Sequence, residues 1–192
     1  MYLLIAGLII FLGLHSVRIF AEGWRSQKLA QWGEGGWKGA YSVVSIVGFA
    51  VIVWGYGQSR LAPVVLWVPP VATRHIAATL MLLAVVLLVA AYVPGNAIKA
   101  KLHHPMILAV KTWALAHLLA NGNLADVLLF GAFLAWAVAD FISCRKRDRA
   151  AGTVYPAGKA VPTVVTVVVG LAVYGGFVMY LHKWLIGVPV FG

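Results

Sequence analysis

The sequence predicts an all-α integral membrane protein with about six transmembrane helices and both termini on the periplasmic side. Of its 192 residues, 62% are hydrophobic and only 10% are charged, whereas about a quarter of the residues in a soluble domain are charged. The apolar residues also occur in runs close to the roughly 20 residues that a helix needs to cross a bilayer. The length suits a single transmembrane domain over residues 1–192, without a separate soluble module.

Six apolar segments are expected to span the membrane as helices, because a strand exposed to lipid would leave its backbone groups unpaired. The spans are predicted at residues 2–21, 40–57, 75–93, 105–120, 124–143 and 162–185. The first lacks a basic leader and a convincing cleavage site, so it is predicted to remain as a helix. Pro94 and Gly95 end the third span, an Asn-Gly-Asn turn at residues 121–123 precedes the fifth, and Pro162 begins the sixth. The proline-containing residues 61–70 are predicted to form a loop on the outer surface.

The basic residues predict the orientation, because cytoplasmic loops of membrane proteins carry an excess of Lys and Arg. With the amino terminus outside, eleven basic residues fall in cytoplasmic segments, and only Arg60, Arg74 and Lys183 fall outside. The net charge of +10 is therefore interpreted as a topology feature. Nucleic acid is not an expected partner, since binding it would need a folded basic face outside the membrane. The expected partner is the lipid bilayer.

Ionisable side chains inside the spans are the first candidates for a functional site, because they are costly in lipid and usually face the protein interior. Four residues qualify: His15, His104, Lys111 and His117. His104 and His117 belong to one predicted helix and are thirteen positions apart. At 1.5 Å per residue their separation is about 20 Å, so they cannot bind the same iron atom. His15, in the first span, is the natural partner from another helix.

Two hypotheses for these histidines remain open. In the first, His15 and His117 are the axial ligands of a haem, which neutral imidazoles in apolar surroundings commonly bind. Arg18 and Lys111 would then be electrostatic partners of the haem propionates, and His104 would lie beside the site on the cytoplasmic side. In the second, the histidines form only structural hydrogen bonds between helices. No catalytic residue is identified.

The sequence has too few cysteines and too few carboxylates within the spans to form a cysteine-based site or a carboxylate-bridged metal site. The only cysteine, Cys144, excludes an internal disulfide and a cysteine-based metal cluster. It is interpreted as a cysteine at the membrane boundary. The only carboxylates within the spans are Asp126 and Asp140, both predicted near the ends of the fifth span, so a carboxylate-bridged metal site is not expected.

Several sequence blocks, in their order and spacing, resemble the NnrU family. The most specific are His-Pro-Met at residues 104–106 and the run KTWALAHLLANGN at residues 111–123. The resemblance is supported by Leu-His-Ser at 14–16 and by LWVPP at 66–70 followed by Arg-His at 74–75. The resemblance implies a multi-pass protein of the bacterial inner membrane, linked to nitrite and nitric oxide metabolism in denitrifying bacteria. Other membrane proteins of nitrogen-oxide metabolism are its implied partners.

The NnrU family is similar to 15-cis-zeta-carotene isomerase, a haem b membrane enzyme that exchanges a ligand at iron with redox state. The histidines that match its ligands are His15 and His117. That isomerase has a cysteine three residues before the second histidine, proposed as the alternate ligand. Here the position is Ala114. This difference disfavours an isomerase that works by such an exchange.

Two further alternatives follow from the same residues. A His-Pro pair at the start of a short membrane helix also resembles membrane S-adenosylmethionine methyltransferases, which usually show Arg-His-Pro and a later pair of glutamates. This chain has His103 in place of that arginine, and its only glutamates, Glu22 and Glu34, lie in the predicted first loop. The methyltransferase is therefore the less favoured alternative. The other is a non-catalytic factor that helps a nitrogen-oxide enzyme to assemble or to receive electrons.

Overall fold

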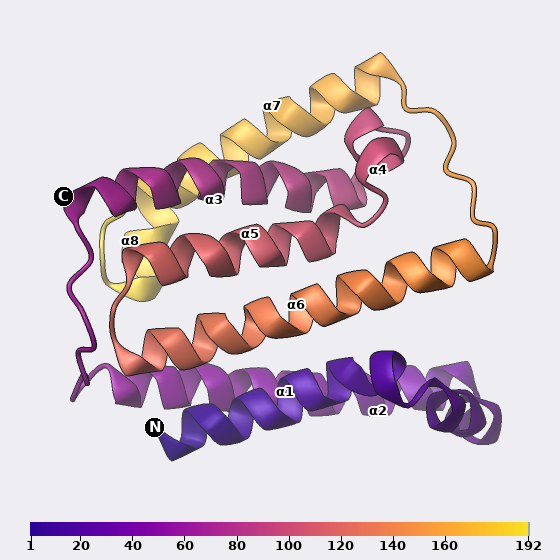
Figure 1. The fold of residues 1–192 in the computed structure, drawn as a ribbon, viewed down its shortest axis with the longest axis horizontal. Helices are drawn as coiled ribbons and strands as arrows, with labels where there is room; N and C mark the ends of the chain where they lie inside the picture. Colours follow the sequence, from indigo (N-terminus) through magenta and orange to yellow (C-terminus); the bar gives the residue numbers. More distant parts are fainter. Residues whose placement is uncertain (192) are drawn as a thin grey trace. The chain divides into compact units, whose positions relative to one another are not determined.

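In the computed structural model, which describes residues 1–191, the chain is helical apart from short connecting segments (Figure 1). The elements, in chain order, are α1 (Tyr2–Phe20), α2 (Glu22–Ser59), α3 (Val71–Tyr92), α4 (Ala97–Leu102), α5 (Pro105–Ala120), α6 (Leu124–Ala150), α7 (Ala160–Gly176), the π-helix η1 (Phe177–Leu181) and α8 (His182–Ile186). By length and composition, five helical stretches among the described residues can cross a membrane, and α5 is a shorter apolar helix. The prediction of an all-α membrane protein with about six spanning helices is therefore confirmed.

The connection between the first two predicted spans is helical, so the prediction of a loop there is wrong. α2 begins at Glu22, directly after α1, and consists of two helical segments that meet at Gly33. Gly33 has φ 69° and ψ 170°, a conformation that is open to glycine because it has no Cβ. No proline occurs between residues 22 and 59, so no other residue in this segment removes a backbone donor.

α6 is longer than predicted, because it continues past residue 143 to Ala150. Its added residues include three arginines and a lysine, which are good helix formers and extend the helix beyond the apolar segment. The prediction that Asp140 lies near a helix end is consequently wrong, since ten further helical residues follow it.

The last predicted span, residues 162–185, lies within one continuous helical stretch, Ala160–Ile186, that contains a π-helical segment. α7 ends at Gly176, and a five-residue π-helix follows before α8 begins at His182. Gly175 and Gly176 precede the change, and adjacent small residues commonly weaken the regular helical pattern. α5 also has the predicted bounds, Pro105–Ala120.

The chain forms two compact units, which are described separately. The first contains residues 1–68 and 122–140, and therefore α1, α2 and the first part of α6. The second contains residues 69–121 and the chain from 141 onward, and therefore α3, α4, α5, the last part of α6, α7, η1 and α8.

Glycines allow α1 and α2 to pack closely in the first unit. A Cβ added at Gly7 would lie 2.6 Å from the backbone nitrogen of Ile52, and one at Gly55 would overlap the backbone of Leu4. Gly48 of α2 also meets the backbone of α1. Small residues at such crossings let helices approach within van der Waals contact, which is a main source of helix association in lipid.

A buried carboxylate holds the start of α6 in the first unit. Asp126 is only 3% exposed, and it accepts hydrogen bonds from the hydroxyl of Tyr56 at 2.5 Å and from the side-chain amide of Asn123 at 2.9 Å. Nearby, the backbone N–H of Leu124 donates to the carbonyl of Val64 in the loop after α2. The irregular backbone is thus paired, as it must be where little water is present.

In the second unit, a buried asparagine pairs the backbone groups of the turn between α3 and α4. Asn96 is 1% exposed, and its side-chain amide donates to the carbonyl of Ala90 at the end of α3. Its side-chain oxygen accepts from the backbone N–H of Lys99, which caps the start of α4. The chain after α6 is held against the same turn, because the N–H of Lys159 donates to the carbonyl of Gly95 at 2.8 Å.

Replacing Gly55 with alanine is expected to lower the thermal unfolding temperature in detergent, because overpacking at a close contact costs about 1–3 kcal/mol. Gly57→Ala is the matched control on the same helix, since nothing lies within 4 Å of a Cβ added there. It should leave the unfolding temperature unchanged or raise it. Equal unfolding temperatures for the two variants would contradict the close packing of α1 on α2.

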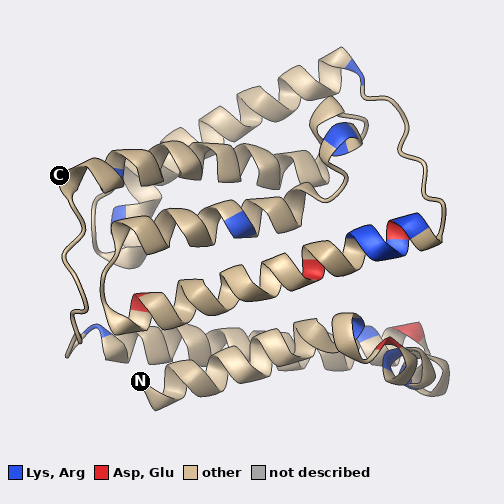
Figure 2. Cartoon of the chain, in the orientation of Figure 1, with Lys and Arg blue, Asp and Glu red and all other residues tan. Residues whose placement is uncertain are grey.

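The orientation of the chain stays a prediction from its charges. Figure 2 shows that charged residues are sparse along most helices and that Lys and Arg gather at the end of α6. If this end is cytoplasmic, a membrane-impermeant maleimide should label Ala62→Cys in intact cells, but not Thr153→Cys. Both positions are exposed, and both variants would carry Cys144→Ser to remove the single native thiol. Labelling of Thr153→Cys in intact cells would reverse the predicted orientation.

Candidate functional site

A strained turn between α4 and α5 begins a polar cluster in the second unit. His103 has φ 67° and ψ −50°, and it is the only non-glycine residue with positive φ among residues 1–191. The backbone N–H of His104 donates to the carbonyl of Leu102 at 2.8 Å, which closes a three-residue γ-turn around His103. Such backbone conformations cost on the order of 1–3 kcal/mol and occur often at functional sites.

A glycine turn at the end of α6 brings a second segment to the cluster. Gly152 has φ 60°, its N–H donates to the carbonyl of Arg149, and the N–H of Thr153 donates to that of Asp148. These two bonds form a Schellman motif, in which glycine accepts the left-handed conformation without a steric penalty. Tyr155 follows the turn and lies beside the last turn of α6, where its hydroxyl contacts Asp148.

The side chains of the cluster meet at Asp148. Its Oδ2 atom lies 2.7 Å from Nε2 of His104 and accepts a hydrogen bond from the Tyr155 hydroxyl at 2.9 Å. The Tyr155 ring stacks on His103, with the ring centroids 4.0 Å apart and the planes nearly parallel at 2°. Burial, and then the hydrogen bond to Asp148, raise the pKa of Tyr155, so its hydroxyl remains a donor at neutral pH. Arg145 donates to Nδ1 of His103.

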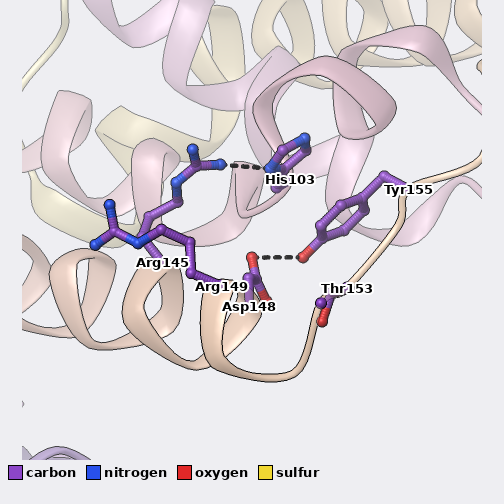
Figure 3. Close-up of a pocket in the computed structure, with 7 residues that line it drawn as sticks. His103, Arg145, Asp148, Arg149, Thr153 and Tyr155 are labelled. Carbon is purple, nitrogen blue, oxygen red and sulfur yellow. Dashed lines mark hydrogen bonds between the residues drawn. The ribbon is translucent and has the colours of Figure 1, made fainter.

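Figure 3 shows a cavity at the end of α6, lined by Asp148, Tyr155, His103 and Arg145 of this cluster among others. Its volume is about 240 Å³. We call it the His103 pocket, and its lining residues are His103, Arg145, Asp148, Arg149, Gly152, Thr153 and Tyr155.

The predicted position of His104 inside a membrane helix is wrong. His104 is the N-cap of α5, with φ −119° and ψ 60°. The reason is local, because Pro105 occupies the first helical position and a residue before proline avoids the helical conformation. His104 therefore belongs to the polar cluster with Asp148.

Most of the His103 pocket was not predicted from the sequence. The sequence pattern predicts only a topological role for Arg145 and Arg149, and it singles out neither Asp148 nor Tyr155. One feature could have indicated them: Asp148 is the only acid in the run Arg-Lys-Arg-Asp-Arg. A carboxylate in such a run indicates a specific partner rather than a general attraction to the membrane surface.

The first predicted haem ligand, His15, lies half-buried in α1 of the first unit. Its Nδ1 atom is 2.7 Å from the backbone carbonyl of Phe11, and its ring stacks on the Phe11 ring at 4.2 Å. Tyr41 and Trp136 lie on other sides of the ring, at 5.2 and 6.0 Å. A carbonyl can only accept, so Nδ1 carries a proton, and in the neutral ring Nε2 keeps its lone pair.

Two buried polar atoms beside this aromatic group have no hydrogen-bond partner among residues 1–191. One is the indole Nε1 of Trp136, and the other is the hydroxyl of Ser45. Ser45 follows Tyr41 by one turn of α2. Leaving a buried donor unpaired costs about 1–3 kcal/mol, so such atoms are rare in native proteins.

The second predicted ligand, His117, has the same local geometry in the second unit. Its Nδ1 atom is 2.9 Å from the carbonyl of Trp113, one turn earlier in α5, and the Trp113 ring lies 5.5 Å from its ring. The carbonyl of His117 accepts hydrogen bonds from the backbone and side chain of Asn121. His15 and His117 are thus held alike, each in its own unit, and their joint ligation of one iron stays a prediction.

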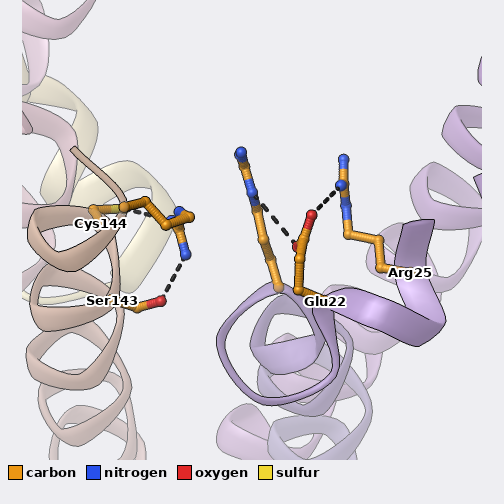
Figure 4. Close-up of polar contacts among 6 residues, drawn as sticks. Glu22, Arg25, Ser143 and Cys144 are labelled. Atoms are coloured by element: carbon orange, nitrogen blue, oxygen red, sulfur yellow. Dashed lines mark hydrogen bonds and ion pairs between the residues drawn. The ribbon is translucent and has the colours of Figure 1, made fainter. Parts of the chain in front are cut away.

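The two predicted propionate partners make other contacts. Nε of Arg18 lies 3.9 Å from Glu22, which also pairs with Arg25 at 3.0 Å (Figure 4). All three side chains are at least partly exposed, and exposed ion pairs contribute only about 0–1 kcal/mol. In the second unit, Nζ of Lys111 lies 4.9 Å from the centre of the Phe141 ring, a cation–π contact.

The single cysteine contacts a nearby arginine. The guanidinium of Arg147 donates to Oγ of Ser143 at 2.6 Å and to Sγ of Cys144 at 2.9 Å (Figure 4). Both contacts lie within one turn of α6. The cysteine is partly exposed on α6, and its position at the membrane boundary stays a prediction.

Comparison with known proteins gives one match. The family model described as "NnrU protein" matches residues 3–190. No curated protein and no solved structure matches the chain.

Replacing Tyr155 with phenylalanine is expected to destabilise the second unit by about 0.5–1.5 kcal/mol, because it removes the hydroxyl donor to Asp148 and keeps the ring stack. Tyr180→Phe is the control, since Tyr180 is 70% exposed and donates no side-chain hydrogen bond among the described residues. Thermal unfolding in detergent measures both variants. If Tyr155→Phe unfolds at the wild-type temperature, the hydrogen bond to Asp148 does not stabilise the cluster.

Proposed function

The chain belongs to the NnrU family, and on this premise we propose that it is a bacterial inner-membrane protein that binds haem b through His15 and His117. In this proposal the chain acts in nitrite and nitric oxide metabolism, as the family resemblance implies, and its partners are other membrane proteins of nitrogen-oxide metabolism.

The shared geometry of the two histidines is the observation that carries the proposal. In each, Nδ1 is held by the carbonyl one turn earlier, at 2.7 Å for His15 and 2.9 Å for His117. Histidines that bind metals usually donate their other N–H to a carbonyl or carboxylate, which sets the tautomer and the direction of the ring. Neutral imidazole is also the usual protein ligand of haem iron.

The surroundings of His15 fit a large, mainly apolar group that carries some polar atoms. Phe11, Tyr41 and Trp136 supply flat aromatic surfaces. The unpaired Nε1 of Trp136 and hydroxyl of Ser45 supply hydrogen-bonding capacity that the described chain does not use.

The cationic residues complete the proposed site. Arg18 follows His15 by about one turn of α1, and its weak pair with Glu22 could be exchanged for a propionate. Lys111 would be the corresponding cation of α5. When bound, haem would supply one-electron redox chemistry, with a potential adjusted by the polarity of its surroundings. The residues of the chain would hold it and exclude water.

The main alternative is a membrane factor without haem, which assists a nitrogen-oxide enzyme. The observation in its favour is that the carbonyl one turn earlier already satisfies one nitrogen of each histidine. An isomerase working by cysteine exchange is disfavoured by Ala114, and a methyltransferase by the absence of a later glutamate pair.

Protein purified in detergent from haem-replete cells is expected to show a Soret band, and reduction should shift it. His15→Ala and His117→Ala should each lower the haem content more than about tenfold, because loss even of residues that support a metal ligand costs 10–100-fold. His75→Ala is the control, since His75 is exposed and outside the proposed site. It should keep the wild-type spectrum.

Colourless wild-type protein that elutes as a folded species would refute haem binding and favour the factor without haem. Loss of the band in only one of the two ligand variants would refute the pairing of His15 with His117. Size-exclusion elution and circular dichroism of each variant separate loss of haem from loss of fold.

A further inference from the structure

We propose that the His103 pocket binds a phosphate group, from either a lipid headgroup or a small soluble phosphate compound. None of its lining residues belongs to the proposed haem site. The proposal rests on four features: two arginines without an acidic partner, a hydrogen-bonded carboxylate, a fixed imidazole donor and a suitable size.

The pocket contains two cations that lack an acidic partner. Residues 145–149 include four basic side chains and one acid, and Figure 2 shows this concentration at the end of α6. Arg145 and Arg149, four positions apart, lie on one helix face and line the pocket. Among residues 1–191, neither forms an ion pair with a carboxylate. Guanidinium groups match phosphate oxygens through paired N–H donors.

The carboxylate in the pocket is already engaged. Asp148 faces the imidazole of His104 and accepts from the hydroxyl of Tyr155, both at Oδ2. These contacts engage Oδ2 in hydrogen bonds and hold the carboxylate at one side of the cavity. It therefore serves to position Tyr155 and His104, and the N–H groups of Arg145 and Arg149 that have no partner in the described part of the chain can contact an anion.

His103 is fixed as a hydrogen-bond donor. Because its Nδ1 accepts from Arg145, the proton of the neutral ring is on Nε2. The γ-turn and the stack on Tyr155 hold the ring in place. The hydroxyl of Thr153, which has no side-chain partner among the described residues, is a further donor in the lining. Figure 3 shows Arg145, Arg149 and His103 around the same cavity.

The size and position of the pocket suit a phosphate group. Its volume of about 240 Å³ is below the roughly 300–1,000 Å³ of pockets for drug-sized ligands. Arg145 follows the predicted end of the apolar span, at residue 143, by two positions. The pocket should therefore lie at the level of the lipid headgroups, where both proposed sources are present.

The test compares Arg149→Gln with Lys146→Gln. Each removes one charge from the exposed end of α6, but only Arg149 lines the pocket. Inorganic phosphate is titrated into the full-length protein in detergent and followed by the shift in thermal unfolding temperature. In a second arm, native mass spectrometry counts phosphatidylglycerol retained from mixed phosphatidylglycerol–phosphatidylcholine nanodiscs.

Arg149→Gln is expected to weaken binding about tenfold, the usual effect of losing one charged hydrogen bond, and Lys146→Gln less than twofold. Thr153→Val is a second, milder variant should Arg149→Gln fail to fold. This pattern with inorganic phosphate supports a site that accepts soluble phosphate. The same pattern with phosphatidylglycerol alone supports a headgroup site. Binding of neither probe, or equal weakening by both charge variants, would overturn the proposal. Haem content does not enter the measurement, so the two proposals fail independently.

Discussion

Backbone hydrogen bonding in the absence of water is the constraint on which this structure depends. In a chain with 62% hydrophobic residues, most of the backbone must cross or border hydrocarbon, where an unpaired N–H or C=O costs several kcal/mol. A helix pairs these backbone groups within one segment. The non-helical segments pair them with groups elsewhere in the chain. The loop after α2 is paired with Leu124, and the segment after α6 is paired with Gly95.

The same constraint explains how polar side chains are tolerated in the apolar helices. Ser16 and Thr112 donate to the carbonyl one turn earlier, as a hydroxyl in a helix commonly does. His15 and His117 make the same bond through Nδ1. The difference is chemical, because a hydroxyl has only one proton to place, whereas an imidazole has a second nitrogen. This difference makes the two histidines candidates for a ligand-binding role.

At the end of α6, where the helix continues past the apolar segment, contacts between polar and charged side chains determine the structure. There the Lys and Arg residues that predict orientation also take part in a specific structure. Asp148 contacts His104 and accepts a hydrogen bond from Tyr155. Among residues 1–191, Arg145 donates to His103 and not to a carboxylate. Two turns with positive φ, at His103 and Gly152, make this arrangement possible. The strain at His103 is offset by its contacts with Tyr155 and Arg145.

The sequence by itself determined the class of the protein, the approximate number of its spans and the bounds of α5, because these depend on composition, on runs of apolar residues and on proline. It also singled out His15 and His117, since ionisable groups in apolar runs are conspicuous. The tertiary structure decided that residues 22–39 are helical, that α6 continues to Ala150 and that His104 joins Asp148 across 44 positions of sequence. The physical reason is that the pattern of apolar residues within a segment indicates which helices form and which of them enter the membrane. The partners of a polar side chain outside the apolar runs depend on which distant turns pack beside it.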